Sequence, residues 1–362
     1  MTVATRDLGA LDARVALRQG SFELDIALVV APGSTVAILG PNGAGKTTVL
    51  RALAGLVELD EGHVRLGDRL LDDATGRHYV PPEQRPCGVV FQQDLLFPHD
   101  TARENVAFGV RSRGATRADA RRRADEWLAR LDVTSVASQR PDQLSGGQAR
   151  RVALARTLAT DPWLLLLDEP LTSLDVSAGA AARALLRDHL AHHDGPCVLV
   201  THDPVDAFTL ADAVVIIEAG AVVQRGTPAE ITARPRSRYA ADLAGVNLLS
   251  GTLEDADTVR VASGTRLAVV DTGLPVGTPV VAVVHPRAVA LYGSRPDGSP
   301  RNVWPVRVVA VDDEGARTRV ELSGAVELVA EITSAAAREL QVAPDTDVWC
   351  TVKASEIVVT RA

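Results

Sequence analysis

Short apolar runs alternate with helical periodicity through the first two thirds of the chain. Residues 22–40 read as two short strands around the turn at Pro32-Gly33, and the second strand leads into a glycine-rich loop. From Lys46 to Leu56 apolar side chains recur at helical spacing, on a face that carries Val49, Leu50, Leu53 and Leu56. The pattern predicts a strand, a loop and a helix, in that order.

The middle of the chain favours helices, and the segments after it favour buried strands. Residues 114–131 are rich in alanine and arginine and put Trp127, Leu128 and Leu131 on one side. The runs WLLLLDEP, at 163–170, and CVLVTHD, at 197–203, are short and apolar, as in parallel strands that are buried on both faces. We therefore expect an α/β core with a helical subdomain at about 93–160.

After about residue 235 the pattern changes to valine-rich runs between Gly, Pro and Asp turns, which is typical of a small all-β domain. These runs are Thr258–Ala262, Pro279–Val284, Val306–Val311, Val326–Val329 and Val348–Val352. The expected domains are 1–235 and 244–362. LLSGTLEDAD and WPVRVVAVDD each open a half of the β region, so we expect two half repeats, at 244–297 and 298–362.

Size, charge and cysteine content narrow the class of protein. The 362 residues, of which 46% are hydrophobic, suffice for two packed domains. The formal charge is −8, so the sequence lacks the basic excess that nucleic-acid binders use, and no nucleic-acid partner is expected. Cys87, Cys197 and Cys350 are far apart and form no CxxC pair, which argues against a disulfide framework and against a zinc site.

The sequence offers no segment of its own for a membrane. Its N-terminal residues include Asp and Arg throughout and lack the apolar core of a signal peptide. The longest apolar stretches, such as Ala213 to Ile217, fall far short of the roughly 20 residues that span a bilayer. If the protein acts at a membrane, we expect it to do so through a partner.

The segment from Gly40 to Thr47 has the form GxxxxGK[ST] between an apolar strand and a predicted helix, which is the context that a phosphate-binding loop requires. Backbone amides of the loop and the helix N-terminus would cradle nucleotide phosphates. Lys46 would reach the β- and γ-phosphates, and the Thr47 hydroxyl would ligate Mg²⁺. The residues assigned to phosphate binding are Gly40, Pro41, Asn42, Gly43, Ala44, Gly45, Lys46, Thr47 and Thr48.

A second element, residues 164–170, is an apolar strand that ends in two carboxylates. Asp168 would hold Mg²⁺ through water, and Glu169 would orient and deprotonate the attacking water. A DE pair at the end of a strand is by itself commonly a solvated turn, but downstream of a phosphate loop it favours nucleotide hydrolysis. Together the two elements predict a P-loop NTPase.

Leu144-Ser145-Gly146-Gly147-Gln148 resembles the signature motif of ATP-binding-cassette (ABC) proteins without a departure. In that family the motif contacts the γ-phosphate from the opposite protomer of a head-to-tail dimer. The resemblance therefore implies a homodimer, and it assigns Ser145, Gly146, Gly147 and Gln148 to nucleotide binding. Physically the motif is a second helix N-terminus with small residues, which suits an anion.

Further elements of this family occur in the expected order. Gln92 matches the glutamine loop, which senses Mg²⁺ and the attacking water, and His202 matches the switch histidine, which holds the γ-phosphate and that water. Ser173-Leu174-Asp175 matches the loop that signals across the dimer. The family also stacks adenine on an aromatic residue, for which Phe22 is the candidate. Phe22 lies closer to the phosphate loop than is usual, and a place in the core is an equal alternative.

One cassette and no membrane span favour, within this family, the ATPase subunit of an importer with a separate integral membrane permease. Residues 93–113 resemble the LFPHxTxxENVxFG stretch of importer cassettes, which forms the groove for a coupling helix of the permease. The alternative is a plain pair of surface helices. The resemblance implies ATP and Mg²⁺ as cofactors, a peripheral position on the cytoplasmic face of the membrane, and an extracytoplasmic solute-binding protein as an indirect partner.

Residues 298–302 (GSPRN) and 352–356 (VKASE) resemble the SARN and KAS motifs of the Mop/TOBE domain, an OB-like barrel that binds molybdate or tungstate. A guanidinium, an ammonium and hydroxyls suit a tetrahedral dianion. The resemblance places Ser299, Arg301, Asn302, Lys353 and Ser355 around the oxyanion, and ordinary solvated loop residues are the alternative interpretation. The whole chain is similar to ATP-hydrolysing subunits of molybdate importers, in some of which an occupied tail inhibits transport.

Two other functions compete with this interpretation. An importer for sulfate, sugar or iron can carry a tail of the same barrel class, and sulfate is itself a tetrahedral dianion. A soluble non-transport ATPase with a nucleic-acid-binding OB-like module would need a basic groove and stacked aromatics. From residue 244 onward, however, 11 Lys and Arg stand against 15 Asp and Glu, and the aromatic residues are Tyr292, Trp304 and Trp349.

Overall fold

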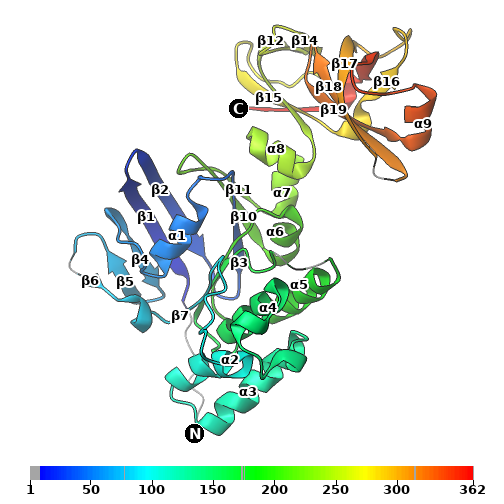
Figure 1. The fold of residues 1–362 in the computed structure, drawn as a ribbon. Coiled ribbons are helices and arrows are strands. Elements are labelled where there is room, and N and C mark those ends of the chain that lie inside the picture. The colour runs from blue at the N-terminus through cyan, green and yellow to red at the C-terminus, as the bar shows by residue number, and fades with distance from the viewer. Residues whose placement is uncertain (1–8, 77, 173, 175, 314, 362) are drawn as a thin grey trace. The chain divides into compact units, whose positions relative to one another are not determined.

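The computed structural model describes residues 9–76, 78–172, 174, 176–313 and 315–361. The chain forms two compact units, Met1–Pro228 and Ala229–Ala362 (Figure 1). This division comes earlier than the predicted limits of 235 and 244. α8 (Arg238–Ala244) belongs to the second unit, because its Ala241 shares an apolar cluster with Val281 and Val283. The short helix α7 (Pro228–Ala233) lies at the division.

Parallel strands form the centre of the first unit, in the order β10-β3-β9-β8-β7. Side chains on both faces of β3, β8 and β9 are buried, which explains why their sequences are continuous apolar runs. The bounds are β3 Thr35–Leu39, β7 Cys87–Val90, β8 Leu164–Asp168, β9 Cys197–Val200 and β10 Ala213–Glu218. The α/β class expected for this part of the chain is confirmed.

The same sheet continues in the order β6-β5-β4-β1-β2-β11, in which β6 to β2 are antiparallel neighbours. β11 pairs in parallel with β2 and antiparallel with β10. β2 alternates between buried and exposed side chains, as a strand does when one face packs on a core and the other meets water. The bounds are β1 Leu11–Gln19, β2 Phe22–Val30, β4 Glu61–Leu66, β5 Arg69–Asp73, β6 His78–Tyr79 and β11 Ala221–Gly226.

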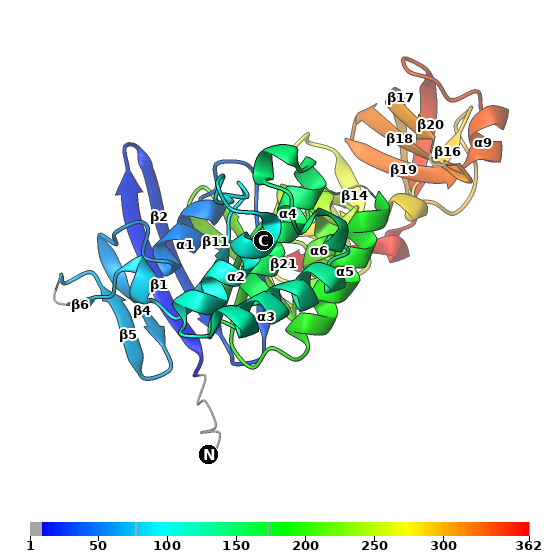
Figure 2. The same ribbon diagram turned by 60° about the horizontal axis from the view of Figure 1, so that its bottom comes forward.

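Helices of the first unit follow the strands or form the predicted helical subdomain. Figure 2 shows α2 (Ala102–Ser112), α3 (Arg117–Arg130) and α4 (Gly146–Leu158) packed side by side. The others are α1 Lys46–Leu53, α5 Val176–Leu190 and α6 Pro204–Leu210, with the 3₁₀ turns η1 Pro82–Gln84, η2 Thr134–Val136 and η3 Pro141–Gln143. Leu56 was wrongly placed on the buried face of the first helix. α1 ends before Gly55, whose φ is 78°, and Leu56 is 47% exposed.

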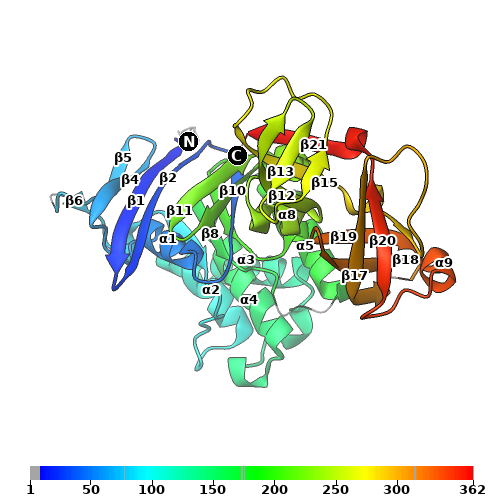
Figure 3. The ribbon, with the colours of Figure 1, turned by 90° about the horizontal axis from the view of Figure 1, so that it is seen from above.

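The second unit packs two five-stranded sheets on one apolar core, as the predicted all-β class requires (Figure 3). One sheet has the order β14-β13-β12-β15-β21 and the other β16-β20-β17-β18-β19. The bounds are β12 Asn247–Asp255, β13 Thr258–Val261, β14 Arg266–Ala268, β15 Pro279–Val284, β16 Ala290–Tyr292, β17 Asn302–Asp313, β18 Arg317–Gly324, β19 Leu328–Thr333, β20 Asp347–Val352 and β21 Ile357–Arg361. Short helical segments are α9 Ser334–Glu339, η4 Pro286–Ala288 and η5 Ala354–Glu356.

The two predicted half repeats exchange their last strands. β16 pairs with β20 of the second sheet, and β21 pairs with β15 of the first. The first strand of each half begins with a buried asparagine that contacts the other sheet. Asn247 exchanges two hydrogen bonds with the backbone of Val329 (2.9 and 2.6 Å), and Asn302 does the same with Ala268 (2.8 and 2.7 Å). Neither half is therefore structurally complete without the other.

Candidate nucleotide and anion sites

The glycine-rich loop lies between β3 and α1, and close packing dictates two of its glycines. A Cβ on Gly40, whose φ is 156°, would stand 2.0 Å from the carbonyl oxygen of Ile217. A Cβ on Gly45, whose φ is 102°, would stand 2.8 Å from Leu24 and 3.0 Å from the ring of Phe22. Because Gly45 is the N-cap residue of α1 and has no side chain, the start of this helix can face an anion.

Lys46 lies against the loop that precedes it. Its Nζ donates to the carbonyls of Gly40 (2.8 Å) and Pro41 (2.9 Å), and the residue is buried. Burial lowers the pKa of the Lys46 ammonium, while the nearby carboxylates of Glu169 and Asp168 oppose that shift. A buried cation at a loop of backbone amides is an arrangement that attracts phosphate.

Asp168, the last residue of β8, faces the start of α1. The hydroxyl of Thr47 lies 3.4 Å from its Oδ1, so a carboxylate and a hydroxyl oxygen face the same space. Burial raises the pKa of Asp168, the Thr47 contact opposes that shift, and the charge of Glu169 reinforces it. A cation at these oxygens would stabilise the ionised form.

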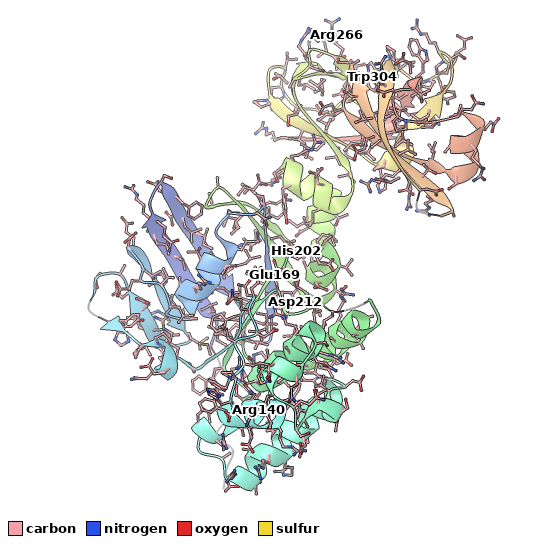
Figure 4. The ribbon with its side chains drawn as sticks, viewed as in Figure 1. Arg140, Glu169, His202, Asp212, Arg266 and Trp304 are labelled. Atoms are coloured by element: carbon pink, nitrogen blue, oxygen red, sulfur yellow. The ribbon has the colours of Figure 1, made fainter. Side chains whose placement is uncertain are left out.

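Glu169 and His202 meet at the carboxyl ends of neighbouring parallel strands, β8 and β9 (Figure 4). His202 Nδ1 lies 2.9 Å from Glu169 Oε1, and the hydroxyl of Thr172 donates to Oε2 at 2.9 Å. The backbone of Glu169 has a φ of 51°, which is unusual for a residue with a side chain, and its amide donates to Val200 at 2.8 Å. Both oxygens of one carboxylate are thus held by side chains.

Arg150 and Thr172 also contact this site, and neither was predicted from the sequence. Arg150, on α4, donates to the backbone carbonyls of both Asp168 and Glu169 and to that of Gln92. Gln92, predicted to sense Mg²⁺ and water, has an exposed side chain and receives this contact through its backbone. An arginine two residues after LSGGQ was visible in the sequence, but its partners lie on other segments.

The LSGGQ segment opens α4 and is separate in the fold from the loop that opens α1. The side chains of Ser145 and Gln148 form a capping box, in which Gln148 N donates to Ser145 Oγ (3.3 Å) and Ser145 N donates to Gln148 Oε1 (2.9 Å). A Cβ at Gly146 would meet open space, so this helix tip is accessible. α4 packs on α2 and α3.

Three further predicted residues are Phe22, Ser173 and Asp175. The ring of Phe22 lies beside Gly45 and packs against the apolar core of the first unit, as the core alternative expects, and its stacking on adenine stays a prediction. Ser173 and Asp175 lie outside the described residues.

A hollow of about 610 Å³ in the second unit contains part of the predicted oxyanion set. Its lining residues are His285, Arg287, Ala288, Ala290, Tyr292, Pro300, Thr351, Lys353 and Glu356. Ser299, Arg301 and Ser355 are exposed and do not line it. Asn302 is 1% exposed and uses both polar atoms of its side chain on Ala268, so the structure gives it a contact within the fold. His285 and Arg287 were not predicted to line this site, because the sequence around η4 contains no recognisable motif.

Comparison with known proteins agrees with this geometry. Residues 24–172 match the family described as ABC transporter, and residues 298–359 match the TOBE domain. The molybdenum import ATP-binding protein ModC of Mycobacterium tuberculosis is 46% identical over 345 residues, covering 92% of this chain and 93% of that protein. The spermidine/putrescine import ATP-binding protein PotA of Roseobacter denitrificans is 38% identical over 296 residues, covering 79% and 80%.

A solved structure supports the same assignment for the first unit. The dimeric, post-hydrolysis structure of the ATP-binding cassette MJ0796 with ADP and Pi aligns with a TM-score of 0.53 and 31% identity, covering 60% of this chain and 98% of that one. The ABC transporter match contains the phosphate loop, the signature motif and the carboxylate pair, and the 46% identical relative is covered almost completely. This chain therefore belongs to the ATP-hydrolysing, ATP-binding proteins of ABC importers.

Proposed function

We propose that this chain drives the import of molybdate, or of its analogue tungstate, through a separate permease. The observation that carries the proposal is the similarity to a molybdenum import ATP-binding protein, which extends over both units at 46% identity and 92% of this chain. The polyamine import protein is less similar over a shorter part of the chain, at 38% identity and 79%. The TOBE match over residues 298–359 supports a tail that handles the same class of solute.

In the proposed reaction, the phosphates of ATP lie on the loop from Gly40 to Thr48 with Lys46 at the β- and γ-phosphates. Glu169 takes a proton from the attacking water, whose oxygen bonds to the γ-phosphorus while the bond to the ADP oxygen breaks. His202 holds the water and the γ-phosphate from its position 2.9 Å from Glu169. Thr172, on the other carboxylate oxygen, restricts how the carboxylate can turn.

The residues present fit a Mg²⁺ ion, which prefers oxygen ligands. Thr47 and Asp168 would hold it, because a hydroxyl and a buried carboxylate with a raised pKa lie 3.4 Å apart at the phosphate loop. The side chain of Gln92 would complete the set from its exposed position. When bound, the ion would neutralise charge on the β- and γ-phosphates.

The proposed active form is a head-to-tail dimer in which Ser145, Gly146, Gly147 and Gln148 of one copy face the phosphate loop of the other. The separate positions of the two helix tips within one chain support this arrangement, and so does the dimeric state of the MJ0796 structure. Leu95, Phe97 and Phe108 are exposed beside one another in the helical subdomain, with ring centroids of the two phenylalanines 4.7 Å apart. This apolar surface suits a permease on the cytoplasmic side of the membrane.

Among the described residues, no helix combines the length and the apolar character that a membrane span needs. We further propose that the hollow around Lys353 binds the oxyanion. The predicted residues Ser299, Arg301 and Ser355 are chain neighbours of its lining residues Pro300 and Glu356. The lining of this hollow includes the cations Arg287 and Lys353 and the imidazole of His285, together with the carboxylate of Glu356, and Arg287 also pairs with Glu331 at 2.9 Å.

The test of the nucleotide site is Glu169→Gln. We expect this variant to form an ATP-dependent dimer in size-exclusion chromatography and to hydrolyse ATP roughly 10²–10⁴-fold more slowly than wild type, which is the usual contribution of a general base. Glu126→Gln, an exposed change on α3, is the control and should behave as wild type. Near-normal turnover by Glu169→Gln would show that Glu169 is not the general base.

The test of the solute is uptake by vesicles that contain the chain with its permease and solute-binding protein. We expect ATP-dependent accumulation of molybdate and tungstate, and none of spermidine. Sulfate is the stringent competitor because it is also a tetrahedral dianion. Accumulation of sulfate or spermidine in place of molybdate would refute the proposed substrate while leaving the ATPase assignment intact.

A further inference from the structure

Arg150 is a buried arginine with an unusual number of partners in the first unit. The residue is 3% exposed. Its Nη1 donates to the carbonyls of Phe91 (2.5 Å) and Gln92 (3.2 Å) and to Asp94 Oδ1 (3.1 Å). Its Nη2 donates to the carbonyl of Asp168 (2.9 Å) and to that of Glu169. One guanidinium therefore binds five oxygens.

These oxygens belong to two segments that the chain itself does not connect closely. Phe91, Gln92 and Asp94 follow β7, in the glutamine loop, whereas Asp168 and Glu169 end β8. Arg150 lies on a third segment, α4, one turn after the LSGGQ tip. A single side chain thus ties the signature helix to the loop and to the turn that carries Glu169.

The cost of this arrangement argues against simple space filling. A buried guanidinium loses its hydration, and Arg150 Nε is buried without a hydrogen-bond partner among the described residues. Apolar side chains would fill the same volume without that penalty. In return, the guanidinium holds a turn whose backbone is strained, since Glu169 has a φ of 51°.

We infer that Arg150 is a positioning residue, which fixes the direction of the Glu169 carboxylate and couples it to the signature helix and the glutamine loop. The inference rests on the assigned ATP hydrolysis, and it adds Arg150 to the residues on which this reaction depends. When the tip of α4 binds a nucleotide in a dimer, Arg150 couples this binding to the position of Glu169 in the same chain. ATP binding itself needs no contact from this side chain.

Arg150→Lys tests the geometry while it keeps the charge. An ammonium on a flexible stem cannot reach five acceptors that a planar fork spans. We expect kcat to fall about 10–100-fold, because a misplacement of about 1 Å can cost 10²-fold in rate. The KM for ATP should stay within about 2-fold, since the phosphate loop is untouched. Arg150→Met, which removes all the hydrogen bonds, should show at least the same loss of kcat.

Arg85→Lys is the matched control, because Arg85 is also a buried arginine with several carbonyl partners. It donates to Val80, Ala52 and Leu53 and pairs with Asp72 at 2.6 Å, away from the carboxylate turn. It should lower the melting temperature as much as Arg150→Lys does and leave kcat near that of wild type. A comparable fall in kcat for both variants would reduce Arg150 to a packing residue and overturn the inference.

A second readout does not depend on turnover. In nucleotide-free protein, deuterium uptake by amides of residues 91–94 and 168–172 should rise together in Arg150→Lys and Arg150→Met and stay unchanged in Arg85→Lys. Unchanged uptake in both segments would overturn the inference. Absence of hydrolysis by wild type would instead contradict the enzymatic assignment, and the exchange experiment would still decide whether Arg150 ties the two segments.

Discussion

At the scale of single residues, burial shifts the pKa values of two groups in the nucleotide site in opposite directions. It lowers the pKa of Lys46 and raises the pKa of Asp168, because desolvation disfavours whichever form is charged. The charged neighbours of each group offset the effect of burial only in part, so a phosphate would further stabilise the ammonium and a cation would further stabilise the carboxylate. The site is electrostatically suited to a metal–phosphate pair rather than to either ion alone.

His189 provides a prediction about pH and stability at the same scale. It lies on α5 with its ring centroid 5.1 Å from that of Trp127, and burial, reinforced by His193 and opposed by Asp161, lowers its pKa to about 4. The unfolded chain takes up a proton near pH 6.5, which the folded chain refuses until about pH 4. The stabilising contribution of neutral His189 is therefore complete above pH 6.5 and is lost as the pH falls toward 4.

The variant His189→Phe keeps an aromatic ring and removes the titration. We expect its unfolding free energy to fall less steeply than that of wild type between pH 7 and pH 4, by on the order of 2 kcal/mol. Urea unfolding at several pH values measures this difference. His192→Phe, at an exposed neighbour, is the control. Parallel pH curves for wild type and His189→Phe would contradict the expectation.

At the scale of elements, helix starts carry both stability and function. Ser145 caps α4 and Thr116 caps α3 in the same way, with side-chain oxygens accepting from Gln148 N and Asp119 N. Replacing either cap by alanine should cost about 1 kcal/mol of stability. Ser145→Ala should in addition weaken ATP-dependent dimerisation, whereas Thr116→Ala should not. Equal dimerisation by the two variants, measured by light scattering with ATP, would argue against the part assigned to Ser145.

The elements also show which features of the site could be predicted from the sequence alone. The phosphate loop, the carboxylate strand and LSGGQ were predictable, because their chemistry depends on residues that are adjacent in the chain. The meeting of Glu169 with His202 follows from two parallel strands, since their carboxyl ends share an edge of the sheet. The contacts of Arg150 could not be predicted, because their partners lie 18 and 58 residues away.

The tail was harder to predict for a similar reason. Valine-rich alternation identified its strands, but the exchange of β16 and β21 between sheets depends on long-range pairing of short segments. Asn302 illustrates the limit. Its motif suggested an anion ligand, whereas the fold buries it at a contact between the two sheets that Asn247 repeats in the other half. Composition could not separate these two uses of an asparagine.

At the scale of the whole molecule, a single solute is proposed to be both what the ATPase imports and what its tail binds. The tail carries more acidic than basic residues, 15 against 11, so long-range attraction cannot account for anion binding there. Affinity would have to come from local hydrogen bonds of Lys353, Arg287 and His285, which line the hollow together with Glu356. This arrangement would let the tail report the cytoplasmic level of the solute.

The variant Lys353→Ala tests that connection. In calorimetric titrations of the full chain we expect it to weaken molybdate binding about 10-fold or more, because a charge-assisted hydrogen bond contributes about 1.5–3 kcal/mol. Arg266→Ala, which removes an exposed arginine paired with Glu254 in the same unit, should leave binding unchanged. In vesicles with the permease, inhibition of transport by internal molybdate should disappear in Lys353→Ala and also in Arg301→Ala. Inhibition that persists in both variants while their molybdate binding is lost would mean that the tail does not regulate transport, even though it binds the oxyanion.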